Sequence, residues 1–155
     1  MARPLKEYFS QVRCSDAYDY GYAPLRDFLA YPYETNVVDW VITNPPFRLA
    51  EDFVHRSLDV ARFGVAMLVR TVFLESVGRY NRLFSRKPPS VFAQFVERVP
   101  MVRGRLDAKA TTATGYAWLL WQHGENTSKL AWIPPCRRTL ERANDYGYGR
   151  QKLLL

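Results

Sequence analysis

A strongly apolar strand pattern that stops at a pair of prolines is the feature that most restricts the fold of this chain. Residues 37–42 read Val-Val-Asp-Trp-Val-Ile, a β-branched and mostly apolar run without clean alternation. Such a run predicts a central strand that is covered on both faces of its sheet. The segment Asn44-Pro45-Pro46-Phe47 follows almost at once. Prolines lack the backbone N–H that a sheet ladder needs, so this segment ends the strand.

An amphipathic helix and a second buried strand come next. The helix is predicted over residues 48–62, with Leu49 and Phe53 on an apolar stripe. Gly64 ends the helix, and residues 65–69 read Val-Ala-Met-Leu-Val, again a buried-strand pattern. Strand, helix and strand at this short spacing predict a right-handed parallel crossover.

The remaining segments complete one predicted domain. A helix is expected over 75–85, strands over 90–99, 115–121 and 130–133, and loops over 101–114 and, in flexible form, 146–149. No helix pattern separates the strands at 90–99 and 115–121, which predicts an antiparallel pair at the sheet edge. The sequence therefore predicts a single α/β domain over residues 1–155, with a mainly parallel sheet and an antiparallel C-terminal hairpin.

The amino-terminal third gives weaker patterns. A short helix is predicted over 4–10 and a short strand over 11–15 that ends at Asp16. A tyrosine-rich loop over 17–24 follows, and Asp27-Phe28-Leu29 is interpreted as the end of another short strand. Both predicted strands would thus end at or include an acidic residue.

Composition excludes several classes of protein. Hydrophobic residues make up 48% of the 155, which argues against wholesale disorder. The start of the chain lacks the apolar stretch of a signal peptide, and no apolar run is long enough to span a membrane. Cys14 and Cys136 form no CxxC pair, so neither a disulfide framework nor a zinc site is expected. We expect a cytoplasmic protein without a bound metal.

The formal charge of +7 favours polyanionic partners, because lysine and arginine release counterions from phosphates. Two basic groups stand out, one around a predicted helix end and one around the loop that precedes the 115–121 strand: Arg79, Arg82, Arg86 and Lys87, and Arg98, Arg103, Arg105 and Lys109. Either group could hold phosphates, and either could instead be a solvated surface.

The Asn-Pro-Pro-Phe segment has the residue types that a reaction at an aromatic amine requires. Such an amine is a poor nucleophile because its lone pair is delocalised into the ring. The side-chain oxygen of Asn44 and the carbonyl of Pro45 could accept its two hydrogens and favour a pyramidal nitrogen. Pro45 and Pro46 would stiffen the segment, and Phe47 offers a flat surface on which a base can stack. A diproline turn with Phe47 packed under the following helix is the plainer alternative.

Asn44-Pro45-Pro46-Phe47 resembles the motif of class I S-adenosylmethionine-dependent amino-methyltransferases, especially DNA N6-adenine methyltransferases. That motif is Asn or Asp, Pro-Pro and an aromatic residue, and all four positions match. The resemblance implies a Rossmann-like methyltransferase fold, S-adenosylmethionine as cofactor, and adenine N6 as the methyl acceptor, with DNA preferred over RNA. It also implies cofactor contacts for Asp16 with the ribose hydroxyls, and for Asp27 and Phe28 with the adenine.

The sequence departs from the family at the cofactor loop. The family's first strand ends in a Gly-rich loop, whereas this chain has no G-x-G-x-x-G and too few residues before Gln11 for a strand, loop and helix. We therefore expect a methyltransferase-like domain without its first strand. Three explanations stay open: a truncated reading frame, a complementing chain, or lost catalysis. An exposed strand edge would favour a homo-oligomer or that complementing chain.

Alternatives to DNA methylation also stay open. The same motif can serve methylation of RNA adenine or of a protein glutamine amide. A non-catalytic, methyltransferase-like nucleic-acid-binding protein or partner subunit is the alternative from another functional class.

Overall fold

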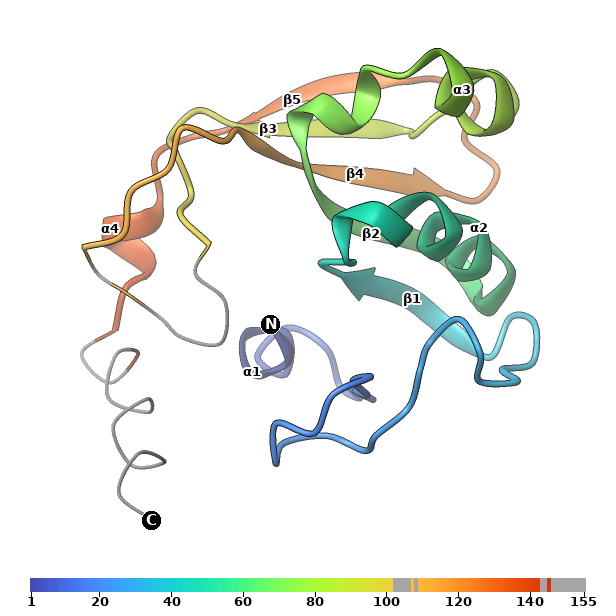
Figure 1. The fold of residues 1–155 in the computed structure, drawn as a ribbon, viewed down its shortest axis with the longest axis horizontal. Helices are drawn as coiled ribbons and strands as arrows, with labels where there is room; N and C mark the ends of the chain where they lie inside the picture. The colour runs from blue at the N-terminus through green and yellow to red at the C-terminus, as the bar shows by residue number, and fades with distance from the viewer. Residues whose placement is uncertain (102–106, 108, 143–144, 146–155) are drawn as a thin grey trace.

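A five-stranded mixed sheet forms the centre of the protein (Figure 1). The computed structural model describes residues 1–101, 107, 109–142 and 145. The strands are β1 (Val38–Thr43), β2 (Ala61–Arg70), β3 (Val91–Phe95), β4 (Tyr116–Gln122) and β5 (Lys129–Ile133). Their order across the sheet is β1-β2-β4-β3-β5.

The predicted strand–helix–strand unit is present. The 3-10 turn η1 (Phe47–Leu49) and helix α2 (Ala50–Val60) connect β1 to β2. The two strands pair in parallel, with Val41 opposite Val65 and Thr43 opposite Met67. The helix is shorter than predicted at both ends, because the 3-10 turn takes its first residues and the extended backbone of Ala61 ends it.

Strand β4 lies between β2 and β3 and is antiparallel to both. The predicted antiparallel pairing of the 90–99 and 115–121 strands is therefore confirmed, but its position at the sheet edge is wrong. The prediction of a mainly parallel sheet is also wrong, because two of the four pairings in the described sheet are antiparallel. Strand β5 pairs in parallel with β3 and forms that edge. The prediction failed because β4 is apolar enough to be covered by strands on both sides, and a pattern along one strand does not name its neighbours.

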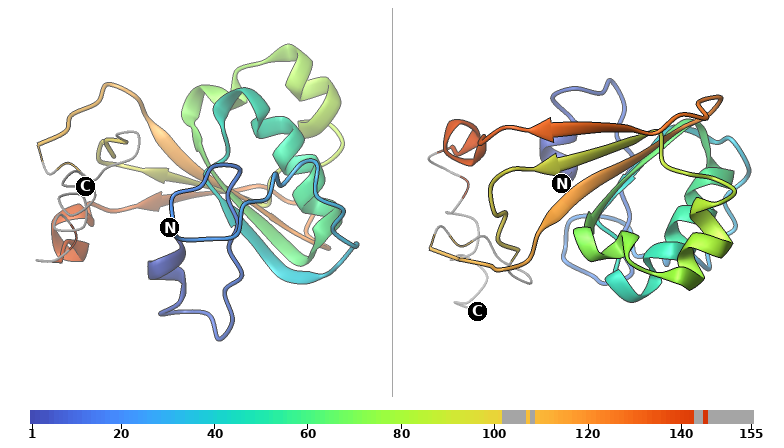
Figure 2. Two further views of the ribbon diagram at one scale, coloured as in Figure 1. Left: turned by 60° about the horizontal axis from the view of Figure 1, so that its bottom comes forward. Right: turned by 90° about the horizontal axis from the view of Figure 1, so that it is seen from above.

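The helices α2 and α3 (Val77–Arg79), with the π-helical turn η3 (Tyr80–Phe84), cover one face of the sheet (Figure 2). The 3-10 turn η2 (Thr71–Leu74) leads from β2 to these helices. The core between sheet and helices is mostly apolar, and Val54, Met67, Leu83 and Leu119 are completely buried in it. The packing of α2 on this core holds β1 and β2 side by side, so their carboxyl ends lie together.

The amino-terminal segment corrects two predictions. It contains helix α1 (Ala2–Leu5), but neither residues 11–15 nor residues 27–29 form a strand. Asp16 makes only an isolated bridge with Leu25. The carboxylates of Asp16 and Asp27 each accept a hydrogen bond from the backbone N–H two residues further on, at 3.0 and 2.9 Å. Such local bonds favour turns over extended backbone, which is why the strands do not form.

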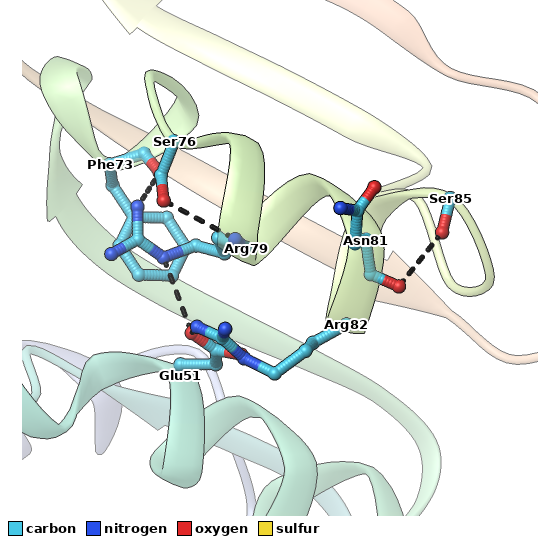
Figure 3. A network of polar contacts seen from close by, with 7 residues as sticks. All are labelled: Glu51, Phe73, Ser76, Arg79, Asn81, Arg82 and Ser85. Atoms are coloured by element: carbon cyan, nitrogen blue, oxygen red, sulfur yellow. Dashed lines mark hydrogen bonds and ion pairs between the residues drawn. The ribbon is translucent and has the colours of Figure 1, made fainter.

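Glu51 ties α2 to the following helical segment (Figure 3). Its carboxylate accepts hydrogen bonds from Arg82 at 2.7 and 2.9 Å and lies 3.7 Å from the Nε atom of Arg79. Arg79 also donates to the carbonyl of Phe73 and covers its ring. The hydrogen bonds from Arg82 lower the pKa of Glu51 below its ordinary value of 4.5.

Glu51→Gln is expected to lower the free energy of unfolding by about 1 kcal/mol at neutral pH, since Arg82 is solvent exposed and its charge is screened. The lowered pKa means that the pair stabilises the fold above pH 4.5 and ceases to do so as the pH falls through that lowered pKa. The free energies of unfolding of the wild type and of Glu51→Gln, measured by urea titration, should therefore become equal in acid. The exposed Glu125→Gln is the control; an equal loss in that variant, or a difference that persists in acid, would contradict the role of the pair.

Candidate active site

The candidate site lies at one end of the strands, where β1 and β2 have their carboxyl ends and β4 begins. The pairing of Arg70 with Tyr116 places the last residue of β2 beside the first residue of β4. Asn44 follows β1 directly, at the same end of the sheet. In sheets with parallel strands, ligands bind at the carboxyl ends. The sequence-predicted motif thus occupies the end of the sheet where a binding site is expected.

Asn44 is exposed and has an available acceptor. Its side-chain nitrogen donates to the sulfur of Met101 at 3.6 Å. Among the described residues, nothing donates a hydrogen bond to its side-chain oxygen. Pro45 is buried, and its carbonyl oxygen also has no partner within the described ranges. Buried backbone carbonyls are normally paired, so the carbonyl of Pro45 is an unusual free acceptor within the described ranges.

The second proline connects the motif to the helix. Pro46 has φ −55° and ψ 125°, an extended conformation that proline favours. Its carbonyl accepts a hydrogen bond from the N–H of Leu49 at 2.9 Å, which opens the turn η1. The motif is therefore held between β1 on one side and α2 on the other, and its backbone has little freedom to move.

The ring of Phe47 has a cation and a second ring as neighbours. The guanidinium carbon of Arg70 is 4.3 Å from the ring centroid of Phe47. The ring of Tyr116, which is buried, lies 6.1 Å away and is tilted by 38°. Phe47 remains 37% exposed. Its ring is thus partly open to solvent beside Arg70 and Tyr116.

Sequence reasoning missed three residues of this site: Arg70, Met101 and Tyr116. The sequence predicted where each of them lies along the chain, namely at the end of one strand, in a loop and at the start of another strand. The contact of Tyr116 with Phe47 depends on the insertion of β4 beside β2, which no local pattern indicates.

The predicted cofactor residues lie in the amino-terminal segment. Asp16 and Asp27 are exposed, and each uses one carboxylate oxygen in its own turn. The ring of Phe28 stacks on Phe53 of α2, with centroids 5.2 Å apart, and contacts Tyr33. No contact within the described ranges joins these residues to Asn44 or Phe47.

The predicted basic groups divide into structural and exposed residues. Arg79 and Arg82 are held by Glu51, whereas Arg86 and Lys87 are exposed. Arg98 is exposed near the site, with its Nη1 atom 3.1 Å from where a Cβ would stand at Gly115. Arg103 and Arg105 lie outside the described residues, as does the segment 146–149.

Glu97 is an acidic residue near this end of the sheet, but its carboxylate is already used. It accepts hydrogen bonds at 2.7 Å from the backbone N–H groups of Cys136 and Arg137, where helix α4 (Arg137–Leu140) begins. These bonds, that from Arg137 foremost, lower the pKa of Glu97. Glu97 therefore anchors α4.

Other kinds of site find no support in the described ranges. Cys14 and Cys136 are free thiols, and no cluster of three or more metal-ligating side chains is present there. In the same part of the chain, no helix has the length and apolar character needed to cross a membrane.

Comparison of the chain with protein-family models, with curated proteins and with solved structures finds no match.

Proposed function

We propose that this chain takes part in methyl transfer from S-adenosylmethionine to an exocyclic amino group, adenine N6 in DNA. The observation that carries the proposal is the placement of Asn44-Pro45-Pro46-Phe47 at the carboxyl end of β1, with the side-chain oxygen of Asn44 and the carbonyl of Pro45 without partners in the described ranges. The resemblance of this motif to the amino-methyltransferases supports the same reaction.

The residues of the chain would act on the amine by position. The side-chain oxygen of Asn44 and the carbonyl of Pro45 accept hydrogen bonds from its two N–H groups, so the nitrogen becomes pyramidal and its lone pair is no longer delocalised into the ring. Phe47 supports the base from one side. The cofactor supplies the electrophilic methyl group when it is bound. Preorganised acceptors of this kind act because they need no reorganisation during the reaction.

The charge of the chain supports a nucleic-acid substrate. The net charge is +7, and Arg70 and Arg98 stand at the same end of the sheet as Asn44. Exposed arginines bind phosphates and position the duplex or strand without reading its bases. The preference for DNA over RNA rests on the resemblance of the motif.

The cofactor half of the proposal has partial support from the residues. Asp16 and Asp27 each keep one carboxylate oxygen outside their turns. The oxygen of Asp16 can accept from ribose hydroxyls, and that of Asp27 from the amino group of an adenine. Phe28 does not fit an adenine contact in this conformation, because its ring stacks on Phe53. The described ranges also contain no Gly-rich loop.

Titration calorimetry of the folded chain with S-adenosylmethionine, followed by transfer of a labelled methyl group to DNA, tests the proposal. We expect binding and label on adenine in DNA; label only on RNA or on a glutamine peptide would change the substrate class. A chain that binds neither cofactor nor DNA would refute the proposal.

A second candidate function is that of a partner subunit in such an enzyme. Strand β1 is the terminal strand of the described sheet. An open cavity beside it is lined by polar and apolar residues of β1 and the amino-terminal segment, among them Leu5, Arg13, Asp39 and Trp40. A free parallel edge of this kind can pair with a strand of a complementing chain or of a second copy. Binding of DNA without binding of S-adenosylmethionine in the same calorimetry would favour this candidate.

A further inference from the structure

Arg70 occupies the place where a stacked base would lie. Its guanidinium stands 4.3 Å from the centroid of the Phe47 ring, a favourable geometry for a cation–π contact. The ring of Tyr116 also lies near Phe47. A planar base can therefore stack on the face of Phe47 that Arg70 covers only after the guanidinium has moved.

The charge of Arg70 is not neutralised inside the protein. No carboxylate in the described part of the chain pairs with it, whereas Arg62, near the other end of the same strand, lies 3.4 Å from Asp39. Arg70 is exposed, so its side chain can turn away from the ring without opening the core. An arginine with five donors and no anionic partner is well suited to bind a phosphate in a planar, bidentate manner.

We propose that Arg70 leaves the Phe47 ring for a backbone phosphate of the incoming nucleotide, and so selects a phosphate-bearing substrate. This inference rests on the proposed function, since it assumes a base on Phe47. Without substrate the guanidinium covers the ring. With a nucleotide, the contact with the ring is exchanged for a charge-assisted contact with phosphate. An uncharged nucleoside displaces the guanidinium but returns no such contact.

The experiment compares two probes that differ in phosphate: a labelled deoxyadenylate hexamer, followed by fluorescence anisotropy over a salt series, and free deoxyadenosine, followed by calorimetry. Arg70→Ala should weaken binding of the hexamer about tenfold at low salt, and should reduce the slope of log affinity against log salt by about 0.7, the value for one phosphate on a single strand. Affinity for deoxyadenosine should stay the same or rise, because the ring is uncovered.

Two further variants make the result specific. Arg70→Lys keeps the charge and should keep the salt slope. Arg62→Ala, which removes an arginine from the opposite end of β2, should change neither probe. An unchanged slope in Arg70→Ala, an equal loss for both probes, or a wild-type chain that does not bind the hexamer would each overturn the inference. None of these readouts uses methyl transfer, so failure of the reaction and failure of the Arg70 contact are separable.

Discussion

Replacing Asn44 by alanine is expected to slow methyl transfer to adenine at least about a hundredfold, the size of effect seen when one preorganised polar group is removed from an active site. The side chain is exposed, and its one hydrogen bond in the described structure goes to the sulfur of Met101. The fold should therefore survive the substitution. The loss should appear in the rate of the chemical step, measured in a single turnover with labelled cofactor, and not in DNA affinity.

Two variants decide what Asn44 contributes. Asn44→Asp keeps an acceptor oxygen at the same place and should retain much more activity than Asn44→Ala. Asn126→Ala removes an exposed asparagine from the turn between β4 and β5 and should have no effect. If Asn44→Ala transfers methyl groups at the wild-type rate, Asn44 has no part in the mechanism and the motif is only a strand-ending turn.

The sequence predicted the part of the fold that local patterns determine. The apolar run before Asn44, the amphipathic helix and the second apolar run each have a period that fits one kind of element. Because a helix connects the two strands, their parallel pairing follows from chain geometry. The position of Asn44 at the carboxyl end of a strand could therefore be predicted without coordinates.

The parts that were missed depend on contacts between distant segments. Strand β4 had two possible places, at the sheet edge or between β2 and β3, and both give the same apolar pattern. The choice brings Tyr116 beside Phe47, so this neighbour of the motif could not be predicted. In the amino-terminal segment, Asp16 and Asp27 bond to their own backbone, which overrides a weak strand pattern.

The close contact of β1, β2 and β4 at Gly64 gives the largest expected effect on stability. A Cβ at this position would lie 2.6 Å from ring atoms of Trp40 and 2.7 Å from the carbonyl oxygen of Trp121. The indole could turn, but the carbonyl belongs to β4, which pairs with β2 at this point through Gly64 and Gln122. Relief of the clash requires the strands to separate. Gly64→Ala should therefore lower the free energy of unfolding by about 2–3 kcal/mol.

Urea unfolding of Gly64→Ala, with Gly78→Ala as the matched control, measures this effect. At Gly78 a Cβ would meet only the end of the Arg82 side chain, at 2.9 Å, and alanine is the better helix former. That variant should change the free energy of unfolding by less than about 1 kcal/mol.

Trp40→Phe combined with Gly64→Ala should recover only part of the loss, because the carbonyl of Trp121 remains. Full recovery would place the strain in the indole alone, and equal stability of Gly64→Ala and the wild type would mean that β2 and β4 can separate at little cost.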